Sequence, residues 1–142
     1  MSEFFRSTSV QMTEEYGKQL AKELQGGTVL ALFGGMGMGK TALVRGIAAG
    51  LGLSAEVSSP TFALVHDYGG RPPLVHFDMY RVTGWEDLYS TGFFDYLDAG
   101  AILVVEWSEN IEGALPENAV KITISRGESD NQRIFEIEGA FD

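Results

Sequence analysis

The feature that most constrains this chain is a glycine-rich octapeptide, Gly34–Thr41, with the sequence GGMGMGKT. It fits the pattern G-x-x-x-x-G-K-[ST] in full. The run before it, Thr28–Phe33, has the length and continuous hydrophobicity of a strand buried on both faces of a parallel sheet. The segment after it, Lys40–Leu51, is apolar and helical in pattern. Because strand and helix flank the glycines, a phosphate-binding loop is favoured over a plain glycine-rich turn.

The residue types of the loop suit a nucleoside triphosphate. Glycines let backbone N–H groups approach phosphate oxygens, and the helix that follows presents its positive end to them. Lys40 can reach the β and γ phosphates, and the Thr41 hydroxyl can bind the Mg²⁺ that bridges them. The residues expected to line the nucleotide are Gly35, Met36, Gly37, Met38, Gly39, Lys40, Thr41 and Ala42.

Two acids at the ends of apolar strands are candidates for the metal. Glu106 follows Ile102–Val105, and Asp78 follows Leu74–Phe77. Burial of a carboxylate costs free energy unless a cation or hydrogen bonds offset it, so these acids stand out from those on exposed helices. The alternative for each is a solvated strand end. Glu106 is preferred as the Mg²⁺ ligand beside Thr41, and Asp78 is expected to share the site or orient the attacking water.

Other polar and aromatic residues carry weaker signals. Thr61 follows Ser-Ser-Pro and is a candidate sensor of the γ-phosphate or its metal, with a plain Ser-Pro turn as the alternative. His76 shares a strand face with Asp78 and is interpreted as a hydrogen-bonded packing residue. Trp85 and Trp107 are interpreted as packing or interface residues.

The apolar pattern along the chain predicts one α/β domain, residues 1–142, of the P-loop NTPase type, with a mixed, largely parallel sheet flanked by helices. Helices are expected from an N-cap at Thr13 to Gly26-Gly27, over Lys40–Leu51, and within Trp85–Leu97. Strands are expected at Phe4–Thr8, Thr28–Phe33, Phe62–Tyr68, Leu74–Tyr80, Ala101–Glu106, Val120–Ser125 and Arg133–Glu138.

The net charge of −10 argues against direct binding to nucleic acid, because phosphate contacts need clustered Lys and Arg. Eight of the twenty acids lie between Arg81 and Lys121, a stretch with no base. Acids interleaved with aromatics make the segment 82–120 a candidate surface for a protein partner, with a solvated helical face as the alternative. In the rest of the chain, twelve acids nearly balance ten bases, so Lys40 and Arg45 are expected to set a positive field at the loop.

Several classes are excluded by composition. The chain has no Cys, which rules out a disulfide scaffold and thiolate zinc sites. Its longest aliphatic run, Ala101–Val105, is far too short to span a bilayer, and no segment reads as a signal peptide. The expected compartment is the cytoplasm, with no membrane partner.

Several motifs in a fixed order resemble the TsaE (formerly YjeE) family. They span about Thr8 to Ser125 and comprise the phosphate loop, Ser59-Pro60-Thr61-Phe62, His76-Phe77-Asp78-Met79-Tyr80-Arg81, Glu86 with Gly92 and Tyr96, and Val105-Glu106-Trp107. Members are small bacterial ATPases needed to make N6-threonylcarbamoyladenosine in tRNA. The chain departs from the family in having Met36 and Met38, where Leu and Ala are usual.

The resemblance implies roles for residues and partners. Lys40 and the loop amides would hold the phosphates of ATP or ADP, Thr41 and Glu106 would serve Mg²⁺, and Thr61 and Asp78 would lie in the active site. Trp107 would lie near the nucleotide. The family works with the proteins TsaD and TsaB, so tRNA would be met only through them, and ATP hydrolysis would reset that complex.

Two other functions stay open on the residues alone. A small-molecule kinase uses the same loop, but it usually needs an arginine-rich lid, and the arginines after residue 51 are scattered. A nucleotide-dependent binding module with negligible turnover is the other. A GTPase is disfavoured because the chain has no Asn-Lys-x-Asp motif.

Overall fold

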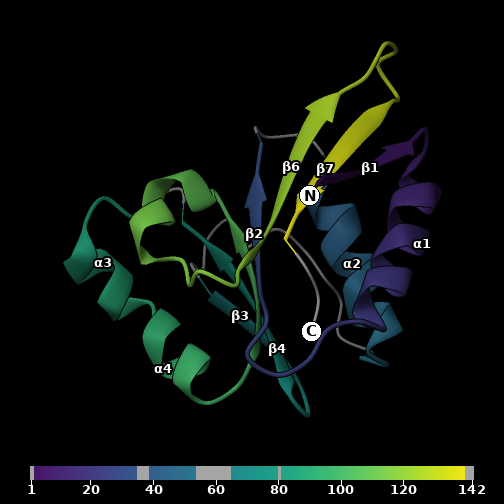
Figure 1. Cartoon of the computed structure of the whole chain (residues 1–142). Helices are drawn as coiled ribbons and strands as arrows, with labels where there is room; N and C mark the ends of the chain where they lie inside the picture. Colours follow the sequence, from purple (N-terminus) through teal and green to yellow (C-terminus); the bar gives the residue numbers. More distant parts are fainter. Residues whose placement is uncertain (1, 35–38, 54–64, 80, 140–142) are drawn as a thin grey trace.

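One seven-stranded sheet forms the centre of the molecule (Figure 1). The computed structural model describes residues 2–34, 39–53, 65–79 and 81–139. In spatial order the strands are β1 (Ser2–Ser7), β7 (Arg133–Glu138), β6 (Val120–Arg126), β2 (Val29–Phe33), β5 (Ile102–Glu106), β4 (Pro73–Asp78) and β3 (Val65–Gly70).

The sheet is mixed, and its parallel part is central. Strand β2 pairs in parallel with β5 and β6, and β4 pairs in parallel with β5. Antiparallel pairs lie outside them: β3 on β4 at one edge, and β6 on β7 and β7 on β1 at the other. The predicted α/β class with a mixed sheet is therefore confirmed.

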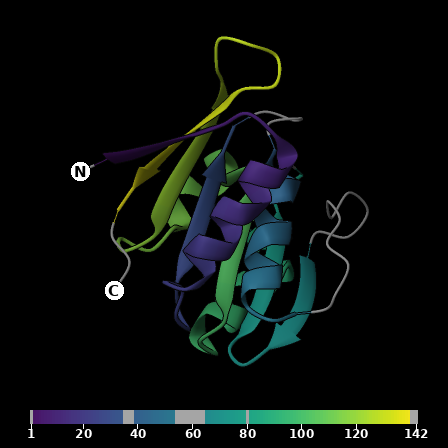
Figure 2. The ribbon, with the colours of Figure 1, turned by 90° about the vertical axis from the view of Figure 1, so that its right-hand side faces the viewer.

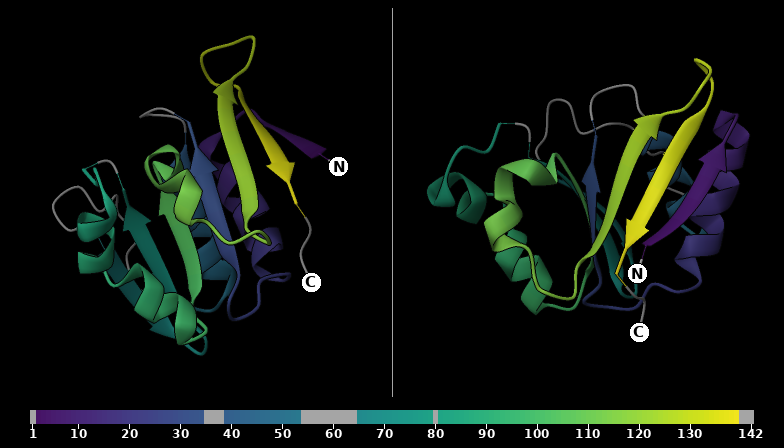
Figure 3. Two further views of the ribbon diagram at one scale, coloured as in Figure 1. Left: turned by 60° about the vertical axis from the view of Figure 1, so that its left-hand side comes forward. Right: turned by 45° about the horizontal axis from the view of Figure 1, so that its top comes forward.

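Helices cover both faces of the sheet. Helices α1 (Val10–Ala21) and α2 (Lys40–Gly50) lie side by side on one face (Figure 2). The opposite face is covered by α3 (Trp85–Ser90), α4 (Phe93–Asp98) and the 3-10 helix η1 (Ser108–Ala114) (Figure 3). Each face buries its own hydrophobic cluster, which explains why the central strands read as continuous apolar runs.

Strand alternation decides which face each side chain joins, and β5 shows the result. Ile102 and Val104 belong to the cluster under α1 and α2, whereas Leu103 and Val105 belong to the cluster under α3 and α4. Because successive side chains point to opposite faces, Glu106 continues the row that faces α2. The terminal acid of β5 therefore lies on the side of the sheet where α2 begins.

The start and end of α1 differ from the prediction. Ser9, not Thr13, caps the helix, and its hydroxyl accepts a hydrogen bond from the Met12 backbone N–H at 3.1 Å. Thr13 is buried one turn further on, where its hydroxyl shares a 2.7 Å hydrogen bond with that of Ser7. The helix closes at the Lys22 cap, before the glycine pair, because the Lys22 N–H already bonds carbonyls of the last turn.

Helices α1 and α2 approach each other at glycines. A Cβ added to Gly46 would collide with the backbone of Glu14, and one added to Gly17 would meet the Leu43 carbonyl oxygen at 2.5 Å. Only glycine permits this contact, so the two helices pack backbone to backbone. In the described part of the chain, no helix is both long and apolar enough to cross a membrane.

Candidate functional site

The residues on either side of the predicted phosphate loop, Gly34 and Gly39, lie where three parallel strands end side by side. Strand β2 runs between β5 and β6, so Gly34 leaves the sheet at the edge where β5 ends in Glu106. Gly39 adopts a left-handed conformation with φ 89° and precedes α2, a position that suits glycine. The predicted phosphate ligands Gly35, Met36, Gly37 and Met38 lie outside the described residues, whereas the strand before them and the helix after them are confirmed.

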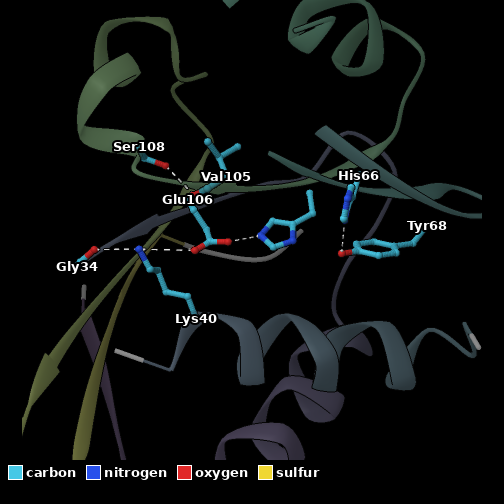
Figure 4. A network of polar contacts seen from close by, with 8 residues as sticks. Gly34, Lys40, His66, Tyr68, Val105, Glu106 and Ser108 are labelled. Atoms are coloured by element: carbon cyan, nitrogen blue, oxygen red, sulfur yellow. Dashed lines mark hydrogen bonds and ion pairs between the residues drawn. The ribbon is translucent and has the colours of Figure 1, made fainter. Parts of the chain in front are cut away.

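Lys40, the first residue of α2, is held in a buried position despite its charge. Its side chain is 5% exposed. The ammonium donates a hydrogen bond to the Gly34 carbonyl at 3.0 Å and lies 3.6 Å from Oε1 of Glu106 (Figure 4). Burial of an ammonium group costs free energy unless the group is paired, so these two oxygens stabilise Lys40 in its buried position at the start of α2.

Glu106 has a second partner, His76, which lies on the neighbouring strand β4. Nε2 of His76 lies 2.5 Å from Oε2 of Glu106, and the imidazole is fully buried. Burial alone would raise the pKa of Glu106, but the hydrogen bond from His76 and the charges of His76 and Lys40 outweigh it and hold the pKa below its ordinary value. The carboxylate is therefore ionised, and the Nε2–H of His76 donates to it.

Among the described residues, Glu106 is the one hydrogen-bond partner of the His76 ring. Its Nδ1 is buried and finds no partner within the described ranges. The prediction that His76 is a hydrogen-bonded packing residue is therefore confirmed, but the sequence did not predict its role as the partner of the Glu106 carboxylate. The sequence holds only a weak signal for this role: a His on the same strand face as Asp78.

The ends of β4 and β5 are tied together just beyond the acids. The Met79 N–H donates to the Glu106 carbonyl at 3.0 Å, and the Asn110 side chain donates to the Met79 carbonyl at 2.8 Å. The buried Ser108 hydroxyl donates to the Val105 carbonyl at 2.9 Å (Figure 4). These hydrogen bonds hold the ends of β4 and β5 in place, and with them the side chains of Asp78 and Glu106.

Asp78 lies opposite Glu106 in the sheet register, since the two residues are Cα partners of the β4–β5 pair. Asp78 is half-buried. The structure therefore brings the two predicted strand-end acids to the same edge, beside the start of α2. The other proposed site residue, Thr61, lies outside the described residues. Thr41 follows Lys40 in the first turn of α2 and is half-buried.

Trp107 occupies a strained backbone position directly after Glu106. Its φ of 57° and ψ of 42° are left-handed, which costs a non-glycine residue roughly 1–2 kcal/mol. Its ring lies 4.8 Å from the Lys40 ammonium, a cation–π contact. Strain of this kind persists where surrounding contacts impose it, and it is common at functional sites. The two tryptophans therefore differ in their surroundings: Trp107 contacts Lys40, whereas Trp85 is 58% exposed.

A pocket of about 340 Å³ opens beside the start of α2. Gly39 and Ala42 form one wall, the residues that precede α1 form another, and the β6–β7 turn forms a third. Arg133, the first residue of β7, donates hydrogen bonds to two carbonyls of that turn, those of Asp130 (2.6 Å) and Gln132 (3.0 Å). Sequence reasoning attached Ala42 to the site but missed the turn, because only the fold brings β7 near α2.

One expectation about charge needs correction. Arg45 does not supply a free positive charge to the loop, because its guanidinium pairs with Glu14 on α1 at 2.8 Å. Arg45 lies one turn along α2, on the side that faces α1. No cluster of three or more His, Asp or Glu side chains able to hold a metal ion occurs among the described residues.

Comparison with known proteins gives a consistent set of matches. Residues 7–135 match the family described as "Threonylcarbamoyl adenosine biosynthesis protein TsaE". The protein of that name from Treponema pallidum is 38% identical, over 83% of this chain and 87% of that protein. Its namesake from Streptomyces coelicolor is 40% identical, over 82% and 80%. The crystal structure of Bacillus subtilis YdiB superposes with a TM-score of 0.81 at 30% identity, covering 96% of this chain and 84% of that one.

Proposed function

Because this chain belongs to the TsaE family, we propose that it binds and hydrolyses ATP in the biosynthesis of threonylcarbamoyladenosine in tRNA. The observation that carries the ATP proposal is the buried Lys40 ammonium, held between the Gly34 carbonyl and the Glu106 carboxylate at the start of α2. A buried cation at the end of a phosphate loop is poised for an anionic ligand. Phosphate oxygens would replace the carboxylate as its partner.

Release of Lys40 toward phosphate would leave Glu106 available for Mg²⁺. The carboxylate is ionised, as a Mg²⁺ ligand must be, and His76 still holds its other oxygen. Mg²⁺ usually takes one or two protein carboxylates and completes its shell with phosphates and water, which agrees with the absence of a larger acidic cluster in the described part. When bound, Mg²⁺ neutralises charge that develops on the β and γ phosphates.

Within this proposal each residue has a role of its own. Thr41 and Glu106 hold the metal, and backbone N–H groups from Gly35 to Ala42 hold the phosphates. Asp78 orients the attacking water from its position beside Glu106 on the sheet edge. Thr61 senses the γ-phosphate. Trp107 lies near the nucleotide, a role supported by the 4.8 Å between its ring and the Lys40 ammonium.

The 340 Å³ pocket beside Gly39 and Ala42 is the proposed place for the nucleoside. It is of ligand size and adjoins the phosphate loop. Thr8 is an exposed residue of its wall, so Thr8→Trp would fill the pocket without disturbing the core. Equilibrium dialysis should show weaker ATP binding by this variant, with inorganic triphosphate binding unchanged. Equal affinities of variant and wild type for ATP would place the nucleoside elsewhere.

TsaD and TsaB are the proposed partners, with tRNA reached only through them. The net charge of −10 supports this indirect contact, because a chain of that charge repels a phosphate backbone. Turnover by the isolated chain is expected to be slow, and addition of TsaD and TsaB should raise it. A kinase is the alternative for the same loop. Formation of only ADP and inorganic phosphate supports the ATPase. Formation of ADP and a phosphorylated acceptor supports the kinase.

Substitution of Lys40 tests the proposal directly. Lys40→Ala should lower the rate of ATP hydrolysis by at least ~100-fold. The rate is measured as phosphate release with TsaD and TsaB present. Lys40→Met keeps the aliphatic stem and should lose as much, which separates loss of charge from loss of packing. Lys18→Ala is the control, because Lys18 is an exposed lysine of α1. Hydrolysis at the wild-type rate by Lys40→Met would refute the assignment.

A further inference from the structure

Two large aromatic side chains stand in solvent on the face opposite α1 and α2. Trp85 is 58% exposed and Tyr89 65% exposed, and both belong to α3. Their rings gather around Phe94 of α4: Trp85 stacks on Phe94 at 6.3 Å with an interplanar angle of 16°, and Tyr89 lies 5.0 Å from it. These three residues, Trp85, Tyr89 and Phe94, are called the aromatic platform below.

The aromatic platform rests on the core. Phe94 is half-buried and meets Phe93 edge to face at 5.3 Å. Phe93 is fully buried and meets Phe77 of β4 in the same manner at 5.6 Å. The exposed rings are thus the outermost layer of a stack that begins in the sheet. A surface fixed in this way loses little conformational entropy when it binds a partner.

A groove of about 330 Å³ adjoins the aromatic platform, between α3 and η1. Trp85 belongs to both features, so the groove and the exposed rings form one continuous surface. The apolar side chains that line the groove are Val82, Trp85, Leu88, Ile111 and Ala114. A groove of this kind accepts aliphatic side chains from an extended segment or a helix.

The charge of this surface selects its partner. Glu86 and Asp87 are exposed next to Trp85, and Asp95 is exposed next to Phe94. No Lys or Arg occurs between Arg81 and Lys121, so the sequence of α3, α4 and η1 supplies no base to neutralise these acids. A second copy of this chain would bring acids against acids, and a nucleic acid would bring phosphates against them. A basic partner meets attraction from both the carboxylates and the aromatic faces.

We propose that the aromatic platform and its groove bind a protein segment that combines Arg or Lys with aliphatic residues. A guanidinium or ammonium group stacks on Trp85 or Tyr89 within reach of the acids, and an aliphatic neighbour enters the groove beside Leu88. The surface uses neither Lys40 nor Glu106. The proposal therefore stands or falls independently of ATP hydrolysis.

Model peptides provide the first test. We would titrate the full chain by calorimetry with a twelve-residue peptide of alternating Arg and Leu, and with matched Glu–Leu and Arg–Ser peptides. The Arg–Leu peptide should bind, and the Trp85→Ala/Tyr89→Ala variant should weaken it by at least tenfold. The control is Phe4→Ala, because Phe4 is 67% exposed on the edge strand β1. Equal binding of the Arg–Leu peptide by wild type and the double variant would overturn the proposal, as would tight binding of the Glu–Leu peptide.

Charge reversal provides the second test. Glu86→Lys/Asp95→Lys should weaken Arg–Leu binding about tenfold at low salt and remove most of its salt dependence, whereas Glu128→Lys in the exposed β6–β7 turn should not. Asp87 is left intact, because its carboxylate accepts hydrogen bonds from the Thr83 N–H and hydroxyl before α3. Unchanged affinity of the reversed variant would overturn the proposal. So would sedimentation data showing that the aromatic platform holds two copies together, or an RNA oligonucleotide that binds through it.

Discussion

Lys40 and Glu106 are charged and buried, whereas Trp85 and Tyr89 are aromatic and exposed, yet both pairs lie at or after the C-terminal ends of parallel strands. Glu106 ends β5, and the chain that leaves β4 reaches Trp85 after the short connection to α3. The two regions invert the ordinary placement of side chains. The charged region is stable because each of its groups has a partner, and the aromatic region because its base is in the core.

The two regions differ in how much a substitution should lower the free energy of unfolding. In the buried region the loss of one partner leaves an uncompensated charge, so a single substitution is expensive. On the aromatic platform the outermost rings contribute little to folding, and their value lies in binding. The predictions that follow test this contrast, from the largest expected effect to the smallest.

The base of the aromatic platform should carry most of its stability. Phe93→Ala should lower the free energy of unfolding by about 3–5 kcal/mol, because it removes a fully buried ring that contacts both Phe77 and Phe94. Urea denaturation followed by circular dichroism measures this change. A loss below ~1 kcal/mol would show that the exposed rings do not depend on the core beneath them.

Glu106→Gln should reduce ATP turnover by about 100-fold while nucleotide affinity changes only a few-fold. Glutamine keeps the shape of the side chain and a carbonyl oxygen for His76, but it lacks the charge that Mg²⁺ requires. Phosphate release and nucleotide titration measure the two quantities separately. Equal losses of binding and turnover would assign Glu106 a structural role instead.

His76→Phe should lower turnover by about 10–100-fold and raise the Mg²⁺ concentration needed for half-maximal rate, because Glu106 loses the donor that orients it. His76→Gln, which can still donate, should retain more of the wild-type activity. Direct Mg²⁺–nucleotide binding, followed by fluorescence, gives a readout that packing alone would not change. If both variants behave alike, His76 acts only by filling space.

Acid should weaken the buried region selectively. The pKa of Glu106 is lowered in the folded state, so its stabilising contribution is present above the pKa of about 4.5 of the unfolded chain and is lost as pH falls through the lower folded value. The free energy of unfolding of wild type should therefore fall more steeply below pH 4.5 than that of Glu106→Gln. Parallel curves for the two proteins would show that Glu106 is not held ionised by its neighbours.

The exposed rings should be nearly neutral for folding. Trp85→Ala should change the free energy of unfolding by no more than ~0.5 kcal/mol and leave ATP turnover intact. Leu88→Ala, a buried position on the same helix, should cost about 2–5 kcal/mol and serves as the matched control. Similar losses at the two positions would erase the distinction between the platform's surface and its support.

Much of the fold follows from local pattern. Continuous apolar runs mark β2 and β5, and the phosphate-loop sequence marks the turn between β2 and α2. Strand-end acids were identified in the same way, because a carboxylate after four apolar residues has a position that alternation fixes. The α1 cap was predicted wrongly since both Ser9 and Thr13 are acceptable caps, and only the contact between Thr13 and Ser7 decides which one lies inside the helix.

The sequence by itself predicted a phosphate-loop motif, and it determined a mixed sheet and two acids that reach one sheet edge. Only the tertiary structure decided that Lys40 and His76 both turn to Glu106, that Arg45 pairs away from the loop, and that Trp107 covers the site while Trp85 faces solvent. The reason is physical: strand and helix patterns are local, whereas His76 and Glu106 are thirty residues apart and meet only through strand register. Whether a charged side chain is paired, and how far a side chain is exposed, depends on the residues around it, and the tertiary fold decides which residues those are.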